Sequence, residues 1–162
     1  MMTGMMASNI SEPTYFRYCP YCVEEDIEKL GETYWHLLHQ LPGVLICLKH
    51  GELLRNSSKL FRGKNKHTYA AAAKESCISG VKLPIYNNKT ISHLKEIAAD
   101  ILNLSVGDYS FSWSGIQRSY KYLLQKHDFS TVNGTVHQSK FAEEFRWFYG
   151  DELLKALQSQ VD

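Results

Sequence analysis

The sequence predicts a mainly α-helical fold in which a small cysteine-containing subdomain is followed by a helical bundle. Two short cysteine motifs lie between residues 19 and 50, and both have the spacing of tight turns. Apolar residues recur at helical spacing over 90–103, 112–127 and 138–149, which is the pattern of amphipathic helices. Hydrophobic residues make up 44% of the 162 and charged residues 22%, as in ordinary folded proteins.

The start of the chain and its overall charge say little about a partner. The formal net charge is +1 at pH 7, so only local clusters of charge are informative. No apolar run approaches the ~20 residues that a membrane-spanning helix needs. All four methionines lie in the first ten residues, without the basic segment and apolar core of a secretion signal. We expect residues 1–18 to be a lead-in left from a preceding helical domain, and the chain to be a fragment of a longer protein.

Residues 19–55 are expected to form the small subdomain. Its acidic stretch, EEDIEKL, favours a short helix that ends at Gly31. The aromatic-rich stretch that follows is typical of strands and is interrupted by a turn at Pro42-Gly43. Residues 56–89 begin polar and basic and then carry four consecutive alanines, so we expect a linker followed by a short helix.

Residues 90–162 are expected to form a helical, helix-turn-helix-like domain. After the first two amphipathic helices, the dipeptide Asn133-Gly134 indicates a hairpin turn that could serve as a small wing. The third helix, at 138–149, begins beside Ser139, which is a suitable N-cap. A last short helix follows.

The two cysteine motifs together predict one structural zinc ion. Cys19 and Cys22 form a C-x2-C pair, 24 residues follow, and Cys47 and His50 form a C-x2-H pair. Each pair can direct both side chains at one ion, and two pairs complete the tetrahedron that zinc prefers. Such a site contributes roughly 10 kcal/mol or more to the folding of small zinc domains. We therefore predict a zinc ribbon, built from two zinc knuckles, with these four residues as ligands.

Other interpretations of these residues remain open. A redox C-x-x-C pair would need a preceding strand and a long following helix, and a catalytic zinc would use three protein ligands and an open position. Cys77 is expected to be an ordinary buried thiol. His36 and His39 are either further ligands or, as we favour, hydrogen-bonded in the core or in contact with a partner.

The segment YCPYCVEEDIEKLGETYWHLLHQLPGVLICLKHGELL resembles the zinc-ribbon segment of the TniQ/TnsD family of transposition proteins. The similarity rests on C-P-x-C, the Glu-Asp helix, Tyr-Trp-His, His-Gln-Leu-Pro-Gly-Val and C-x-x-H-G. The downstream stretches NKHTYAAA and TVNGTVHQSKFAEEFRWFYGDELLKAL are similar to later parts of the same family. TnsD-type proteins normally carry a helix-turn-helix-containing segment before this point, and we expect that segment to be missing here.

This resemblance implies a target selector for cut-and-paste transposition. Such proteins bind double-stranded DNA at an attachment site and recruit the AAA+ ATPase that regulates the transposase, and they are neither nucleases nor recombinases. The resemblance also places Cys19, Cys22, Cys47 and His50 on the family's zinc-ligand positions and implies a cytoplasmic, nucleoid-associated bacterial protein. No small-molecule substrate or membrane partner is expected.

Two local clusters of basic residues are candidates for DNA contact. Between residues 49 and 66, six lysines and arginines face the single acid Glu52, which suits a phosphate backbone. The second cluster, Arg118, Lys121 and Lys126, lies at helical spacing and could contact phosphates or enter a groove. Separately, the third predicted helix begins with Gln, Ser and Lys, which can contact base edges or phosphates. The candidates are Arg55, Arg62, Lys64, Lys66, Arg118, Lys121, Lys126, Gln138 and Lys140. A solvated loop and the polar face of a core helix remain alternatives for both clusters.

The alternative function is a protein–protein interaction module that does not itself contact DNA. The acidic helix around Glu24, Glu25, Asp26 and Glu28 is expected to be solvated and would suit such docking, because acidic side chains repel DNA. An enzyme is not expected, since the sequence offers no nucleophile with an adjacent base, no phosphate-binding glycine loop and no carboxylate triad.

Overall fold

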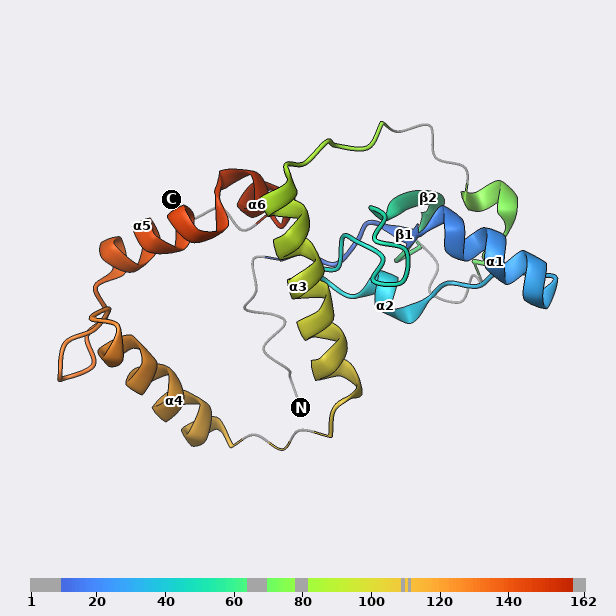
Figure 1. Ribbon diagram of the computed structural model, residues 1–162. Coiled ribbons are helices and arrows are strands. Elements are labelled where there is room, and N and C mark those ends of the chain that lie inside the picture. The colour runs from blue at the N-terminus through green and yellow to red at the C-terminus, as the bar shows by residue number, and fades with distance from the viewer. Residues whose placement is uncertain (1–9, 64–69, 78–81, 109, 111, 159–162) are drawn as a thin grey trace. The chain divides into compact units, whose positions relative to one another are not determined.

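The computed structural model describes residues 10–63, 70–77, 82–108, 110 and 112–158 (Figure 1). The chain divides into two compact units, Met1–Ser105 and Val106–Asp162, each considered by itself below. The expected division at residues 18, 55 and 89 stays a prediction. Among the described residues, no helix is long and apolar enough to cross a membrane.

The first unit contains a two-stranded antiparallel sheet that we did not expect. Strand β1, Tyr15–Tyr18, pairs with β2, Arg55–Leu60, with Tyr18 opposite Arg55 and Tyr15 opposite Leu60. The sequence of β2, RNSSKL, has no apolar alternation, and we interpreted it as the start of a linker. Pairing between segments about 40 residues apart, rather than local propensity, makes it a strand.

Helix α1, Pro20–Leu30, follows β1 after a single residue. Pro20 occupies the first helical position, where its missing N–H costs nothing. Gly31 ends the helix with a left-handed φ of 79°, and its N–H donates to Ile27 O at 3.0 Å. The expected helix and its end are therefore both confirmed.

The stretch that we expected to be a strand contains a helix instead. Helix α2 is the single turn Leu37–Gln40, and the segment after it pairs through an isolated bridge between Ile46 and Leu53. Prediction from aromatic content was wrong here, because these aromatic and histidine side chains make specific contacts in a small core. Trp35, for example, stacks on Phe16 with ring centroids 4.7 Å apart.

The core of the first unit is small. Val44 and Ile46 are fully buried, and Tyr18, Val23 and Cys77 form a separate buried cluster. Cys77 ends the short 3-10 helix η2, Lys74–Cys77, whereas we expected a helix that also contained the four alanines before Lys74.

Helix α3, Asn88–Val106, is the long helix that the sequence predicted from residue 90 onward. It buries Leu94 and Ala98, which lie one turn apart on the same face. Near its start, the side chain of Asn87 accepts a hydrogen bond from the N–H of Thr90 at 2.8 Å.

The second unit contains α4, Trp113–Lys126, α5, Gln138–Tyr149, and α6, Asp151–Ala156. A bridge between Ser130 and Val136 closes the loop that joins α4 to α5. Within this described part of the chain, α6 buries Leu153 and Leu154, whereas neither α4 nor α5 has a fully buried side chain. Ser139 is not the cap, because α5 begins one residue before it and His137 stands at the N-cap.

The predicted fold class is confirmed: a mainly α protein with a small cysteine-containing sheet subdomain followed by further helices. The helix-turn-helix arrangement of the second half stays a prediction.

Candidate metal centre

The first pair of candidate ligands is placed by the junction between β1 and α1. Cys19 is the N-cap of α1, with an extended backbone at φ −101° and ψ 126°. Its carbonyl accepts the first helical bond, from Val23 N at 3.1 Å, so Cys22 lies in the first turn. Cys19, directly after β1, and Cys22, in α1, therefore place their sulfurs on the same side of this junction.

The second pair lies on a tight turn. Cys47 N donates to Glu52 O at 2.8 Å, and Gly51 N donates to Cys47 O at 2.7 Å. Gly51 has φ 65°, a left-handed backbone that suits glycine, and this lets the chain reverse directly after His50. The Ile46–Leu53 bridge fixes the base of the turn.

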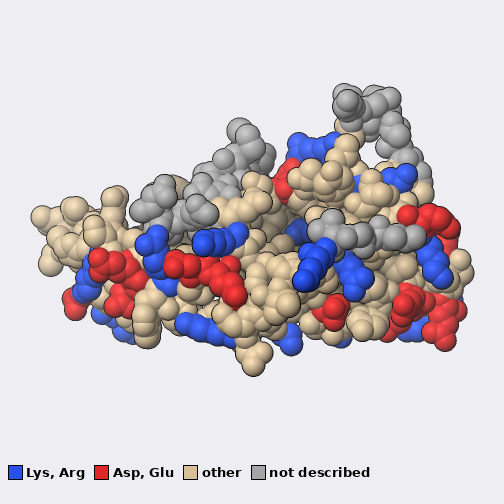
Figure 2. Space-filling model, turned by 90° about the horizontal axis from the view of Figure 1, so that it is seen from above, with Lys and Arg blue, Asp and Glu red and all other residues tan. Residues whose placement is uncertain are grey.

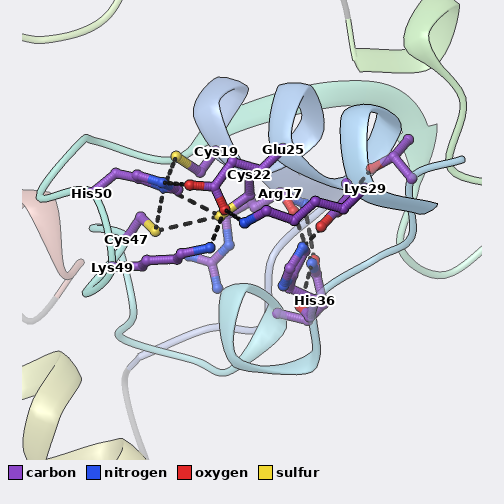
Figure 3. A network of polar contacts seen from close by, with 12 residues as sticks. Arg17, Cys19, Cys22, Glu25, Lys29, His36, Cys47, Lys49 and His50 are labelled. Atoms are coloured by element: carbon purple, nitrogen blue, oxygen red, sulfur yellow. Dashed lines mark hydrogen bonds and ion pairs between the residues drawn. The ribbon is translucent and has the colours of Figure 1, made fainter. Parts of the chain in front are cut away.

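The four side chains converge with the dimensions of a tetrahedral site (Figure 3). His50 Nδ1 lies 3.5 Å from Cys19 Sγ, 3.4 Å from Cys22 Sγ and 3.7 Å from Cys47 Sγ, and the sulfurs of Cys22 and Cys47 are 3.7 Å apart. Zinc bonds of about 2.3 Å to sulfur and 2.0–2.1 Å to nitrogen give tetrahedral edges of roughly 3.5 Å (S–N) and 3.8 Å (S–S). The arrangement could therefore hold one metal ion.

Burial of the sulfurs makes this a closed site. Cys19, Cys22 and Cys47 are at most 3% exposed, and His50 is partly buried. Burial raises the pKa of the Cys19 and Cys22 thiols, so a bound cation is needed to hold them as thiolates at neutral pH. With an ion bound by all four residues, the tetrahedron would be complete.

Cys77 lies apart from the four residues that could hold a metal ion in the described structure. It packs with Tyr18 and Val23 in the buried cluster of the first unit, and burial raises its pKa to about 11. This is the ordinary buried thiol that the sequence predicted.

Glu25 links the two halves of the site. One of its carboxylate oxygens lies 3.0 Å from His50 Nε2, and the other contacts Lys49 and, at 3.4 Å, Lys29 (Figure 3). Contact with Lys49 and then with His50 lowers the pKa of Glu25 to about 2. The expectation that these acids are solvated was wrong for Asp26, which is buried, whereas Glu25 is partly exposed and makes these contacts.

Comparison with known proteins identifies the segment that builds this site. Residues 3–54 match the TniQ family model, and all four candidate ligands lie within that match. Over these residues the chain is similar to the TniQ family. It is also 26% identical over 160 residues to the transposon Tn7 transposition protein TnsD of Escherichia coli. That alignment covers 97% of this chain and 30% of the relative, so the chain spans about a third of the relative's length.

Of the two histidines outside the ligand set, His39 is buried and His36 is partly buried. His36 Nε2 lies 2.8 Å from Asp26 Oδ2, which also accepts from Thr33 Oγ1 at 3.2 Å. His39 is 4% exposed, and its burial lowers its pKa to about 4. In the described residues neither joins the group that could hold a metal ion, so the structure supports the interpretation that we favoured, a place in the core.

Gln40 is a key residue of the TniQ segment that sequence reasoning missed. Its Oε1 accepts from Arg17 N at 2.8 Å, and its Nε2 donates to Arg17 O at 2.8 Å and to His36 O at 3.1 Å. The side-chain amide thus pairs with β1 as a neighbouring strand would. The only sequence signal for this residue was its position in the His-Gln-Leu-Pro-Gly string.

The basic residues of the first unit are partly engaged in other contacts. Arg55 is half-buried in β2, and Arg62 forms an ion pair with Glu12 at 2.6 Å. Lys64 and Lys66 lie outside the described residues. In the described part of the face shown in Figure 2, Lys and Arg side chains lie among Asp and Glu side chains, without a continuous basic field.

The basic residues of the second unit are exposed. Arg118, Lys121 and Lys126 project from α4, where Arg118 Nε donates to Ser114 O at 3.3 Å. At the start of α5, Lys140 Nζ donates to Asp128 O at 3.1 Å. This hydrogen bond holds the positive charge of Lys140 beside an open depression. The residues that line this depression are Asp128, His137, Gln138, Ser139 and Lys140.

Proposed function

We propose that this chain takes part in transposition as a DNA-binding target selector that recruits an AAA+ transposition regulator, with one structural zinc ion. The observation that carries the proposal is the Cys3His tetrahedron inside the segment that matches the TniQ family. Similarity to TnsD over nearly the whole chain supports a role in the same process.

We propose zinc as the ion at this centre. Three thiolates and one imidazole in tetrahedral positions favour zinc over magnesium or calcium, which prefer oxygen ligands and higher coordination numbers. The ion would hold the N-cap of α1 against the turn at residues 47–51 and would take no part in a reaction. We accordingly propose that the chain acts by binding and not by catalysis.

Metal analysis tests the zinc assignment. We expect one zinc per chain after purification, and a Cys47→Ser variant should lose most of it, because one corner of the tetrahedron is removed. Cys77→Ser is the matched control, since Cys77 is also buried and lies outside the site. Full zinc content in Cys47→Ser would show that the ligand set is wrong.

DNA contacts are proposed for the basic side chains of α4, for the start of α5, and for the basic segment after the metal centre. Arg118, Lys121 and Lys126 need no rearrangement to reach a phosphate backbone, because their side chains are exposed. Arg62 would first have to leave Glu12, so we expect it to contribute less than the α4 residues.

Fluorescence anisotropy with labelled attachment-site duplex, measured over a range of salt, tests this proposal. Arg118→Glu and Lys64→Glu should each weaken binding and reduce the slope of log affinity against log salt by about 1 for each phosphate that is no longer neutralised. Glu143→Gln on α5 is a control that should not weaken binding. Unchanged affinity in both basic variants would remove these assignments.

The second candidate is a protein-interaction module, and the exposed side chains between residues 24 and 37 favour it. Glu24, Glu28 and Glu32 are exposed, and the nearby Tyr34 and Leu37 are 52% and 77% exposed. Acidic and apolar side chains together suit a protein partner and repel DNA. If this chain fails to bind duplex DNA even at low salt, the interaction module is the better assignment.

A further inference from the structure

We propose that Glu25 is a positioning residue of the metal centre, whose carboxylate holds the His50 ring so that Nδ1 faces the ion. The inference rests on the zinc site proposed above and adds a residue outside the four ligands. It concerns how the ion is held, and it is independent of what the chain binds.

The two nitrogens of His50 have different surroundings. Nδ1 lies 3.4–3.7 Å from the three cysteine sulfurs, at the fourth corner of the tetrahedron. Nε2 lies 3.0 Å from Glu25 Oε1, an oxygen that can only accept a hydrogen bond when the carboxylate is ionised. A proton on Nε2 leaves the lone pair on Nδ1, so the contact selects the ring form that can bind a metal.

The position of Glu25 in α1 explains why it can make this contact. It stands three residues after Cys22, so both side chains lie on the same side of the helix. Helix α1 therefore supplies one ligand directly and orients a second ligand that comes from the turn at residues 47–51. The helix thus reaches the His50 ring from two sides, through the Cys22 sulfur at Nδ1 and through the Glu25 carboxylate at Nε2.

The remaining contacts of Glu25 leave one oxygen for the histidine. Lys29 and Lys49 both approach Oε2, and His50 approaches Oε1. Zinc with three thiolates and a neutral imidazole has a formal charge of minus one, and the carboxylate adds another negative charge. Lys29 and Lys49 offset these two charges, which allows an acidic side chain to lie beside an already negative centre.

The alternative is that Glu25 serves only to pair with these lysines at the surface, and three variants separate the two roles. Glu25→Ala removes every contact of the carboxylate. Glu25→Gln keeps an oxygen that can accept from His50 Nε2. Lys49→Ala removes an ion pair and leaves the carboxylate beside the histidine.

Glu28→Ala is the matched control for Glu25→Ala. Glu28 lies on the same helix, three residues after Glu25, and its side chain is exposed. The substitution therefore changes the charge and the helix propensity of α1 as Glu25→Ala does, without removing a contact of the His50 ring.

The test is zinc affinity of the full chain, measured by competition with a chromogenic chelator. We expect Glu25→Ala to bind zinc about 10–100-fold more weakly, the usual effect of removing a partner of a metal-bound histidine. Glu25→Gln should recover most of the affinity, and Glu28→Ala should stay close to the unmodified chain. Lys49→Ala should lose less affinity than Glu25→Ala, because Lys29 still pairs with the carboxylate and Oε1 still faces His50. Circular dichroism of the zinc-loaded variants checks that each is folded.

Nitrogen NMR of the His50 ring gives a second readout that a simple surface ion pair would not move. In the zinc-loaded chain, we expect Nδ1 to be metal-bound and Nε2 to carry a slowly exchanging proton, which should exchange faster in Glu25→Ala. Unchanged affinity in Glu25→Ala, or an equal loss in Lys49→Ala, would overturn the inference. If the unmodified chain binds no zinc, the zinc assignment itself is wrong and the inference falls with it.

Discussion

Gln40 offers the sharpest test of how the first unit is held together. Its side chain is 6% exposed and makes three hydrogen bonds, two of them with the backbone of Arg17. Replacement by leucine keeps the approximate volume but leaves the N–H and C=O of Arg17 without these partners. An unsatisfied buried polar group costs about 1–3 kcal/mol, so with two such groups we expect Gln40→Leu to lose roughly 2–6 kcal/mol of unfolding free energy.

Urea-induced unfolding at a fixed free zinc concentration measures this loss, because bound metal itself adds to the apparent stability. Gln117→Leu, at an exposed position of α4, is the matched control and should change the free energy of unfolding by less than about 0.5 kcal/mol. A loss below about 1 kcal/mol in Gln40→Leu would refute the reasoning, since it would mean that water or a small shift of β1 replaces the amide.

Three further predictions concern single side chains. Cys77→Ser should keep one metal per chain, measured by elemental analysis, because Cys77 lies outside the ligand group. The pKa of the His39 ring, measured by NMR, should be about 4, below the ordinary 6.5. Between these two pH values the unfolded chain binds more protons than the folded chain, so His39 makes stability fall as the pH drops through this range. Trp35→Phe keeps an aromatic ring against Phe16 but removes the hydrogen bond from Nε1 to Ala70 O at 2.7 Å, and should cost about 1 kcal/mol in thermal unfolding.

The sequence predicted the longer helices well because their signals are local. Gly31 ends α1 in the left-handed conformation that its position suggested, and α5 covers the predicted range 138–149. The convergence of the four candidate ligands also followed from spacing, since each pair lies on one tight turn. These features depend on residues a few positions apart.

The features that were missed depend on distant residues. Strand β2 exists because it pairs with β1, and nothing in RNSSKL by itself indicates a strand. Glu25 looked like one of several solvated acids, and only the fold brings it to His50, 25 residues away. Gln40 likewise acts through the backbone of Arg17, a contact that residue type alone does not reveal.

The position of the metal centre indicates what the ion would do for the rest of the unit. Tyr18 pairs with Arg55 at one end of the two-stranded sheet; Tyr18 directly precedes Cys19, and Arg55 follows His50 by five residues. An ion at this centre therefore closes the sheet at the end where its strands leave the two metal-binding turns. A two-stranded sheet is only marginally stable in water, so a strong cross-link at this end fixes the register of β2. Because β2 carries Arg55 and precedes the basic segment in the sequence, an ion bound at this centre would also fix where that segment begins.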